Sequence, residues 1–196
     1  MFIEAKFEIP NLKGISAKNI EEHLKLYSGY VKNANLILEK IEELYKDQDP
    51  SKNAYIIAEL QRRFGFEFNG IVNHEYYFEQ FFGGHKPPSL ESDLRKIIEE
   101  QWGSFDLWLN RFKAIAMTRG IGWAMLFYDP LTKQLLNAWV DEQHLGQLNG
   151  CTTILALDMW EHSYVADYNP SGKKQYIEEF FLNLNWQIIE KRLPKA

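Results

Sequence analysis

The sequence has one cysteine, no long apolar run and no excess of basic residues. A single cysteine, Cys151, excludes an internal disulfide and is typical of proteins from a reducing compartment. No stretch of about 18 apolar residues occurs, so we expect no transmembrane helix. The first residues lack a basic segment followed by an apolar one, so we expect no signal peptide and a cytoplasmic location. The net charge of −5 argues against a nucleic-acid-binding protein.

The composition is that of an ordinary globular protein. Of the 196 residues, 45% are hydrophobic and 15% are aromatic, which is enough for one compact body or two small domains that share a core. The Gly- and Pro-rich stretch from Gly83 to Pro88 is the clearest boundary. It predicts an N-terminal helical domain at 1–86 and a C-terminal α/β domain at 87–196.

The first part of the chain predicts a long helical hairpin. Ser16 is a suitable N-cap, and apolar residues at helical spacing predict a helix over 17–46 that ends before Pro50. A second helical segment is predicted over 52–64. We expect the two glycines of 65–70 to interrupt it, and the helix to resume over 71–82.

The second part predicts an α+β arrangement. Helices are expected over 89–101, starting at the cap Ser89, and over 103–117. The hydrophobic period then changes, and runs rich in β-branched and aromatic residues predict three strands. These strands are expected at 123–128, 135–140 and 151–157, with a final pair of helices at 173–182 and 184–192.

Four side chains suited to metal binding stand out. Asp158 and His162 follow the predicted third strand, where a buried acid is costly unless it is paired or bound to a cation. His23 and His74 lie on the two arms of the predicted hairpin and can converge on one point. Three imidazole nitrogens and one carboxylate oxygen suit Mn, Fe or Zn better than Ca or Mg. Alternatively, Asp158 caps a helix and the histidines are packed core residues.

Nearly the whole chain is similar, in order, to the iron/manganese superoxide dismutases. The most specific matches are Asp158-Met-Trp-Glu-His162 and Gly120-Ile-Gly-Trp123. Further matching segments are Ile9–Leu12, Ile20–His23, Tyr30–Asn35, Phe68–Gly70, Asn73–His74, Trp102–Phe105 and Asn185–Trp186. The resemblance implies a helical hairpin followed by an α/β domain with a three-stranded antiparallel sheet. It also implies conversion of superoxide to oxygen and hydrogen peroxide by one-electron redox cycling of a single Mn or Fe ion.

The resemblance also implies roles for individual residues. The metal ligands of the family fall on His23, His74, Asp158 and His162, with solvent as a fifth ligand. Tyr30 corresponds to the tyrosine at the substrate entrance, and Trp123 and Trp160 to the tryptophans that enclose the site. Glu161 corresponds to the glutamate that binds the ligand histidine of the partner subunit, so a homodimer is expected, alone or within a tetramer.

This chain departs from the family pattern in its first helix. His23 and Tyr30 are seven positions apart where eight are usual, so Glu22 is a rival for the ligand position; the Ile-Glu-Glu-His context favours His23. The histidine that usually follows the first ligand is replaced by Leu26 or Tyr27, and its tyrosine partner by Val165. An alternative function is therefore a metal-binding relative with weak or no dismutase activity. A third interpretation is a non-catalytic structural module in which the histidines are only packed core residues.

The metal preference depends on a glutamine that, in this family, bonds the metal-bound solvent. In many iron enzymes it lies four residues before the second ligand, where this chain has Gly70. In manganese enzymes it comes from the loop after the second strand, where this chain has Gln143. The spacing favours Mn, with Fe also usable. His144 is the alternative to Gln143.

Overall fold

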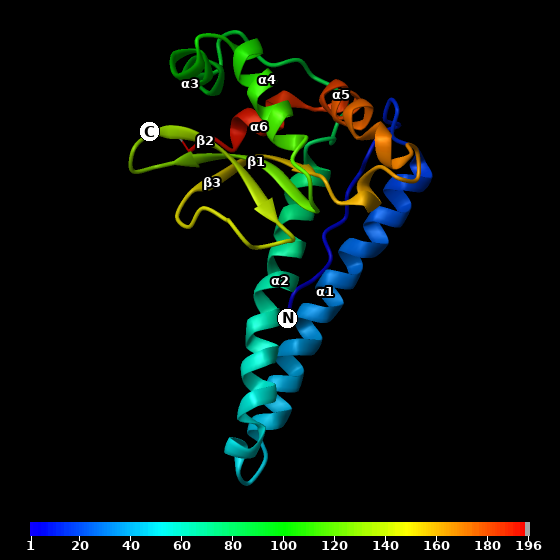
Figure 1. The fold of residues 1–196 in the computed structure, drawn as a ribbon, viewed down its shortest axis with the longest axis vertical. Helices are drawn as coiled ribbons and strands as arrows, with labels where there is room; N and C mark the ends of the chain where they lie inside the picture. The colour runs from blue at the N-terminus through cyan, green and yellow to red at the C-terminus, as the bar shows by residue number, and fades with distance from the viewer. Residues whose placement is uncertain (195–196) are drawn as a thin grey trace.

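A hairpin of two long helices dominates the computed structural model, which describes residues 1–194 (Figure 1). Helix α1 spans Ala17–Tyr45, and α2 spans Ala54–Glu79 after a 3-10 turn at Pro50–Asn53. The hydroxyl of Ser16 accepts a hydrogen bond from the backbone N–H of Asn19, so the predicted cap of the first helix is confirmed. The hairpin is confirmed as well.

The predicted interruption of the second helix at 65–70 is wrong. Helix α2 is continuous, although glycine within a helix costs about 1 kcal/mol relative to alanine. Gly70 is needed because a Cβ atom there would overlap the ring of Tyr30, which packs directly on the backbone of α2. The packing between the two helices therefore outweighs the low helix propensity of glycine.

The helices of the second part are close to those predicted, with one shifted start. Helix α3 spans Asp93–Trp102 and is capped by Ser92, whose hydroxyl accepts from the N–H of Arg95; it does not start at Ser89. Ser89 instead donates its backbone N–H to Glu190, in the last helix. The remaining helices are α4 at Phe105–Ala116, α5 at Lys173–Asn183 and α6 at Trp186–Lys191.

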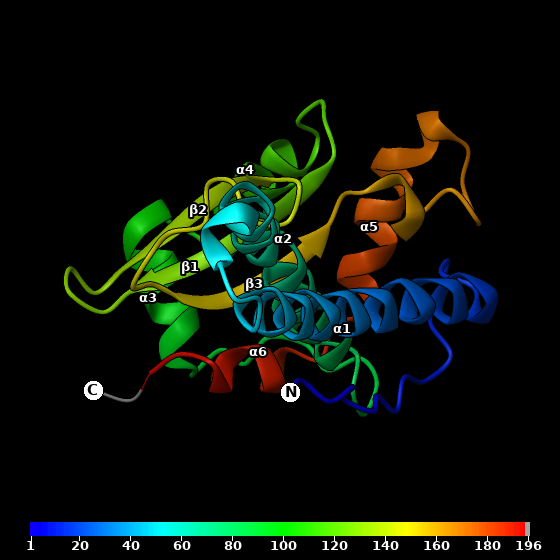
Figure 2. The ribbon, with the colours of Figure 1, turned by 90° about the horizontal axis from the view of Figure 1, so that it is seen from below.

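Three antiparallel strands form the sheet, in the order β2-β1-β3. Strand β1 spans Gly122–Asp129, β2 spans Gln134–Asp141 and β3 spans Thr152–Asp158, so the three predicted strands and the α+β class are confirmed. Figure 2 looks along the hairpin and shows β3 as the strand nearest to α1. The end of β3 is thereby brought against both helices of the hairpin.

One hydrophobic core extends over both parts of the chain. It joins Val31 and Phe78 of the hairpin to Trp108 of α4 and to Leu155 of β3. A second, smaller cluster around Ile37 and Ile57 holds the outer part of the hairpin together. Among residues 1–194, no helix is both long enough and apolar enough to cross a bilayer.

Candidate metal centre

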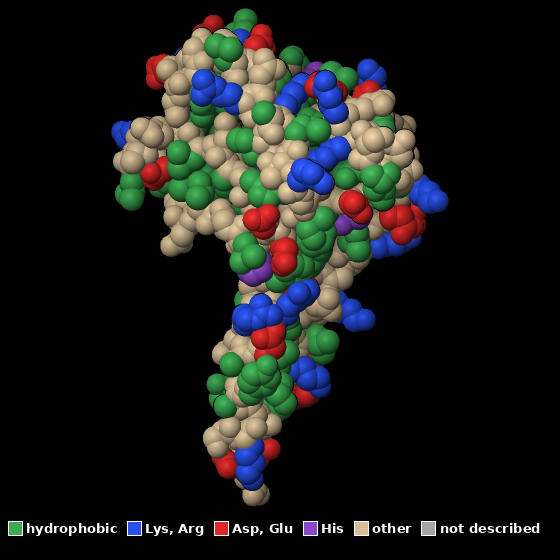
Figure 3. All heavy atoms as spheres, in the orientation of Figure 1, with side chains coloured by type: hydrophobic (Ala, Val, Ile, Leu, Met, Phe, Trp, Pro, Cys, Tyr) green, Lys and Arg blue, Asp and Glu red, His purple; other side chains and the backbone are tan. Residues whose placement is uncertain are grey.

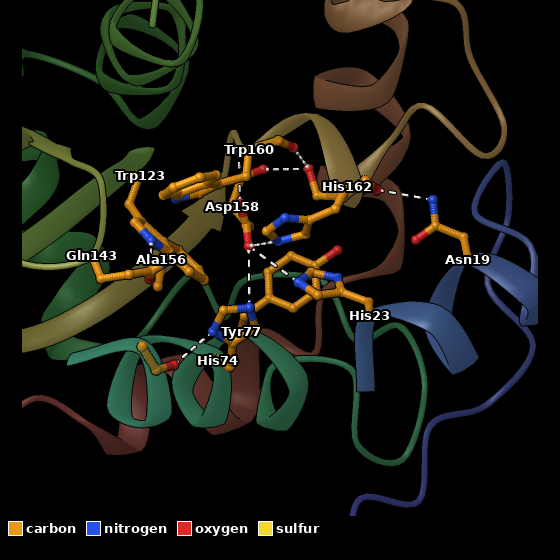
Figure 4. Close-up of polar contacts among 12 residues, drawn as sticks. Asn19, His23, His74, Tyr77, Trp123, Gln143, Ala156, Asp158, Trp160 and His162 are labelled. Atoms are coloured by element: carbon orange, nitrogen blue, oxygen red, sulfur yellow. Dashed lines mark hydrogen bonds and ion pairs between the residues drawn. The ribbon is translucent and has the colours of Figure 1, made fainter. Parts of the chain in front are cut away.

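His23, His74, Asp158 and His162 converge on one buried point (Figure 4). One potential ligand atom from each residue lies within 4.8 Å of the other three. Oδ2 of Asp158 is 3.1 Å from Nε2 of His23, 3.1 Å from Nε2 of His162 and 3.6 Å from Nε2 of His74. The side chains of His23, His74 and Asp158 are fully buried, whereas the side chain of His162 is 21% exposed.

The end of β3 fixes the orientation of the Asp158 carboxylate. Its Oδ1 accepts a hydrogen bond of 2.8 Å from the backbone N–H of Trp160, which leaves Oδ2 to face the imidazoles. The hydroxyl of Ser163 donates to the backbone carbonyl of Asp158 and closes the 3-10 turn Glu161–Ser163 that presents His162. The short spacing between Asp158 and His162 is thus held by local hydrogen bonds.

A backbone hydrogen bond fixes the orientation of the His74 ring, and burial keeps the ring neutral. Its Nδ1 donates to the carbonyl of Gly70 at 2.6 Å, so Nε2 presents a lone pair, and this buried Nε2 has no hydrogen-bond partner among the described residues. Burial lowers the pKa of His74 to about 3, with a further contribution from His23. Burial also lowers the pKa of His23.

The pKa of Asp158 is lowered, whereas the pKa of an ordinary buried acid is raised. Burial alone would raise its pKa, but the charge and hydrogen bonds of His162 and His23 hold the pKa of Asp158 below its usual value. The neutral imidazoles of His23 and His74 and the ionised carboxylate of Asp158 together carry a net negative charge. That is the protonation state in which these side chains bind a cation.

In α1, His23 rather than Glu22 faces the cluster. Glu22 is exposed and accepts a hydrogen bond from Lys25 on the outer face of the helix. Helix α1 is α-helical throughout, so the seven positions from His23 to Tyr30 make about two turns and place both on one face. The ring of Tyr30 lies 5.0 Å from that of His74.

Gln143 is fully buried beside the cluster, between the two halves of the molecule. Its Nε2 donates to the hydroxyl of Tyr30 at 2.9 Å, and its Oε1 accepts from Nε1 of Trp123 at 2.9 Å. Burial, followed by the charge of Asp158, raises the pKa of Tyr30 well above its ordinary value, so the phenol stays protonated. His144 lies apart from this chain of bonds and packs against Phe66.

The two predicted tryptophans pack against different histidines of the cluster. Trp123 presents its ring edge to His74, with ring centroids 5.1 Å apart, and Trp160 stacks on His162 at 5.8 Å. Glu161 is exposed and, within residues 1–194, forms no salt bridge or side-chain hydrogen bond. Its carboxylate is therefore free to meet a group outside this chain.

Some residues near the site were given no role by the sequence analysis. Asn73 donates its side-chain amide to the backbone carbonyl of Gln143 at 2.9 Å, and the ring of Tyr77 lies 4.9 Å from that of His23. The only signal in the sequence was the position of Asn73 next to His74. Lys173 donates to the carbonyl of Thr118 and lies over the ring of Trp139.

Comparisons with known proteins agree with this geometry. The profile of iron/manganese superoxide dismutases, C-terminal domain, matches residues 90–192. An iron superoxide dismutase of Aquifex pyrophilus is 35% identical over 189 residues, which cover 95% of this chain and 87% of that protein. A Mn/Fe superoxide dismutase of Aeropyrum pernix is 32% identical over 97% of this chain and 92% of its own length.

A third relative matches over a shorter region but at higher identity. A manganese superoxide dismutase of Haloarcula marismortui is 46% identical over 114 residues, or 58% of this chain. The chain is thus similar to relatives named for Fe, for Mn and for both, and a site of three histidines and one aspartate is suited to one Fe or Mn ion. The chain belongs to the iron/manganese superoxide dismutase family of oxidoreductases.

Proposed function

We propose that this protein converts superoxide to oxygen and hydrogen peroxide at one Mn or Fe ion held by His23, His74, Asp158 and His162. The observation that supports this most is the convergence of three imidazole Nε2 atoms on one carboxylate oxygen in a buried site. Without a cation, the unpartnered Nε2 of His74 would be a buried polar atom with no compensation.

The donor set fits a redox-active transition metal. Neutral imidazole suits Fe and Mn, and one carboxylate adds a negative charge without closing the site completely. When bound, the ion would supply one-electron chemistry, accepting an electron from one superoxide and returning it to the next. The partial exposure of His162 gives the site a side that a small anion can approach.

The groups next to the cluster supply hydrogen bonds and protons. The reduced product needs two protons, and Tyr30 holds a protonated phenol beside the site, linked to the amide of Gln143. Trp123 fixes the other end of that amide, so Gln143 cannot rotate without losing two hydrogen bonds. We propose that Tyr30 and Gln143 position protons for the reaction, and that Trp123 and Trp160 limit the access of water.

We further propose that Mn is the preferred metal, with Fe as an alternative. Gln143 reaches the site from the loop after β2, while Gly70 leaves the corresponding place on α2 to the ring of Tyr30. This arrangement is the one that the manganese pattern predicts. The position of His144 against Phe66 supports Gln143 as the amide in question.

We propose a cytoplasmic homodimer in which Glu161 binds His162 of the partner subunit. The exposed carboxylate of Glu161 lies next in sequence to His162, which is the only one of the four cluster residues with an exposed side chain. A carboxylate on the outer nitrogen of a ligand histidine orients the ring and raises its basicity. Glu161→Ala should weaken the dimer in sedimentation and reduce metal retention together; an active monomer would contradict the proposal.

The ligand assignment is tested by a neighbouring pair of substitutions. His23→Ala should remove most of the bound metal and most of the activity, because it deletes one of four ligands. Glu22→Ala should preserve both, since Glu22 bonds only to a surface lysine. The opposite result would show that the register of α1 is wrong.

One observation favours a weaker catalyst as a second candidate. Leu26 or Tyr27 stands where the family usually has a histidine; Leu26 is exposed, and the hydroxyl of Tyr27 donates to Glu75 and accepts from the backbone of Ala5. Val165, in place of the usual tyrosine, is exposed. A fully metal-loaded protein that removes superoxide hardly faster than the free metal would support this candidate.

A further inference from the structure

On each outer edge of the three-stranded sheet, a glutamine side chain hydrogen-bonds the backbone of one residue. On β3, Nε2 of Gln80 donates to the carbonyl of Ala156 at 2.8 Å, and Oε1 of Gln80 accepts from the N–H of Ala156 at 2.9 Å. On β2, Gln101 makes the same pair of bonds with Leu135, at 3.1 and 2.7 Å. Each primary amide thus takes the place of a missing neighbouring strand.

The two glutamines differ in what they connect. Gln80 is fully buried at the end of α2, six positions after His74, and Ala156 lies two positions before Asp158 on β3 (Figure 4 labels Ala156). Gln101 joins α3 to β2, and neither of these elements contributes a residue to the metal centre. Of the two glutamines, only Gln80 therefore connects α2, which carries His74, to β3, which carries Asp158.

Arg192 strengthens the connection at Gln80. Its guanidinium donates to Oε1 of Gln80 at 3.2 Å and to the carbonyl of Ile154 on β3 at 3.1 Å. The same group donates to the carbonyl of Tyr76 on α2 at 2.9 Å. The oxygen of Gln80 thus accepts two hydrogen bonds, and the end of α2 is tied to β3 at Ile154 and Ala156.

We propose that Gln80 is a positioning residue for the metal centre, which sets the separation of His74 and Asp158 by fixing α2 to β3. Of the three imidazoles, that of His74 lies farthest from Oδ2 of Asp158, at 3.6 Å against 3.1 Å for the other two. His74 lies on α2 and Asp158 on β3, so the approach of these two side chains depends on how α2 sits against β3. The inference rests on the metal site proposed above.

The test compares Gln80→Leu with Gln101→Leu, because each removes a pair of hydrogen bonds to one residue of a strand edge; Gln80→Leu also removes the bond from Arg192. The protein is loaded with Mn or Fe, and the rate of metal release to an excess of chelator is followed together with the spectrum of the bound metal. Gln80→Leu should release metal about tenfold faster or more, as do changes to groups that orient metal ligands, and should alter the spectrum. Gln101→Leu should lower the melting temperature of the metal-free protein but keep the wild-type release rate and spectrum.

Gln80→Glu provides a second variant if Gln80→Leu does not fold. Its carboxylate keeps the acceptor for Ala156 and Arg192 but loses the donor to the Ala156 carbonyl, so its release rate should lie above that of the wild type. Wild-type release from both Gln80 variants, or equal acceleration by Gln101→Leu, would overturn the inference alone. A wild-type protein that binds neither metal would overturn the proposed function as well.

Discussion

Gln143 and Tyr30 are 113 positions apart in the sequence, yet the amide of Gln143 donates to the phenol of Tyr30 at 2.9 Å. This bond joins the loop after β2 to the first helix of the hairpin, directly beside the four converging residues. Trp123 holds the other side of the same amide. The orientation of Tyr30 on α1 therefore depends on the loop after β2 and on β1.

Replacing Gln143 should affect catalysis more than folding. Gln143→Ala removes the partner of Tyr30 and of Trp123, so we expect activity to fall about tenfold or more and the spectrum of the bound metal to change. Steady-state assays and visible spectra of the metal-loaded variant measure both effects. We expect the loss of these buried bonds to cost about 1–3 kcal/mol of unfolding free energy.

His144→Ala is the matched control for the loop. Its ring packs against Phe66 and makes no hydrogen bond to Gln143 or Tyr30, so activity and spectrum should change little. If the His144 variant alone altered the spectrum, His144 rather than Gln143 would be the residue that bonds the metal-bound solvent. The proposed preference for Mn would then lose its main support.

The close approach of α1 to α2 can be tested at Gly70. Gly70→Ala places a methyl group against the ring of Tyr30, so we expect a loss of about 1–3 kcal/mol in unfolding free energy and a displaced phenol with reduced activity. Gly29→Ala is the control, because a Cβ there meets nothing within 4 Å. It should stabilise the protein by up to about 1 kcal/mol, as expected for alanine in a helix. Equal effects of the two changes would contradict this account of Gly70.

The sequence predicted the class of fold well because its periodic segments are long and its strands are strongly apolar. It failed at 65–70, where two glycines have low helix propensity but the packing of Tyr30 on Gly70 requires one of them. The residues of the cluster were identified from motifs, since periodicity alone left His23 and His74 equally consistent with packing. The contacts of Gln80 and Asn73 could not be predicted, because they depend on how α2 and the sheet meet in space.

Arg63 is the basic side chain on which we expect attraction of the substrate to depend. Its guanidinium lies 3.7 Å from the centroid of Phe66, and the ring of Phe66 is near both Tyr30 and Trp160. The net charge is −5, so an anionic substrate needs a local cation. Figure 3 shows Lys and Arg side chains close to where the hairpin meets the body.

Arg63→Gln should lower kcat/KM by about twofold at low salt, the effect of one charge about 10 Å away in water. The dependence of kcat/KM on ionic strength should also become weaker. Arg62→Gln is the control: both guanidinium groups are paired, Arg63 with Glu67 and Arg62 with Glu59, but it is Arg63 that lies over Phe66. The same change in both variants would mean that general surface charge, rather than Arg63, guides the substrate.

Removal of the metal should destabilise the protein. A ligand present at about 1,000 times its dissociation constant stabilises the folded state by about 4 kcal/mol, which for a chain of this size raises Tm by roughly 8–16 °C. Calorimetry of the metal-free and reloaded protein measures the difference. His74→Ala should abolish the dependence on metal, and a metal-independent Tm in the wild type would contradict a buried structural and catalytic site.

The central claim is that one Mn or Fe ion at this site removes superoxide. The most direct measurement follows the decay of superoxide by stopped-flow spectroscopy, with Mn-loaded, Fe-loaded and metal-free protein of known metal content. We predict about one ion per chain, fast catalytic decay with Mn, and no catalysis by the metal-free protein or by His162→Ala. Decay no faster than with the same concentration of free metal, in a protein that holds its full complement of either ion, would contradict the claim.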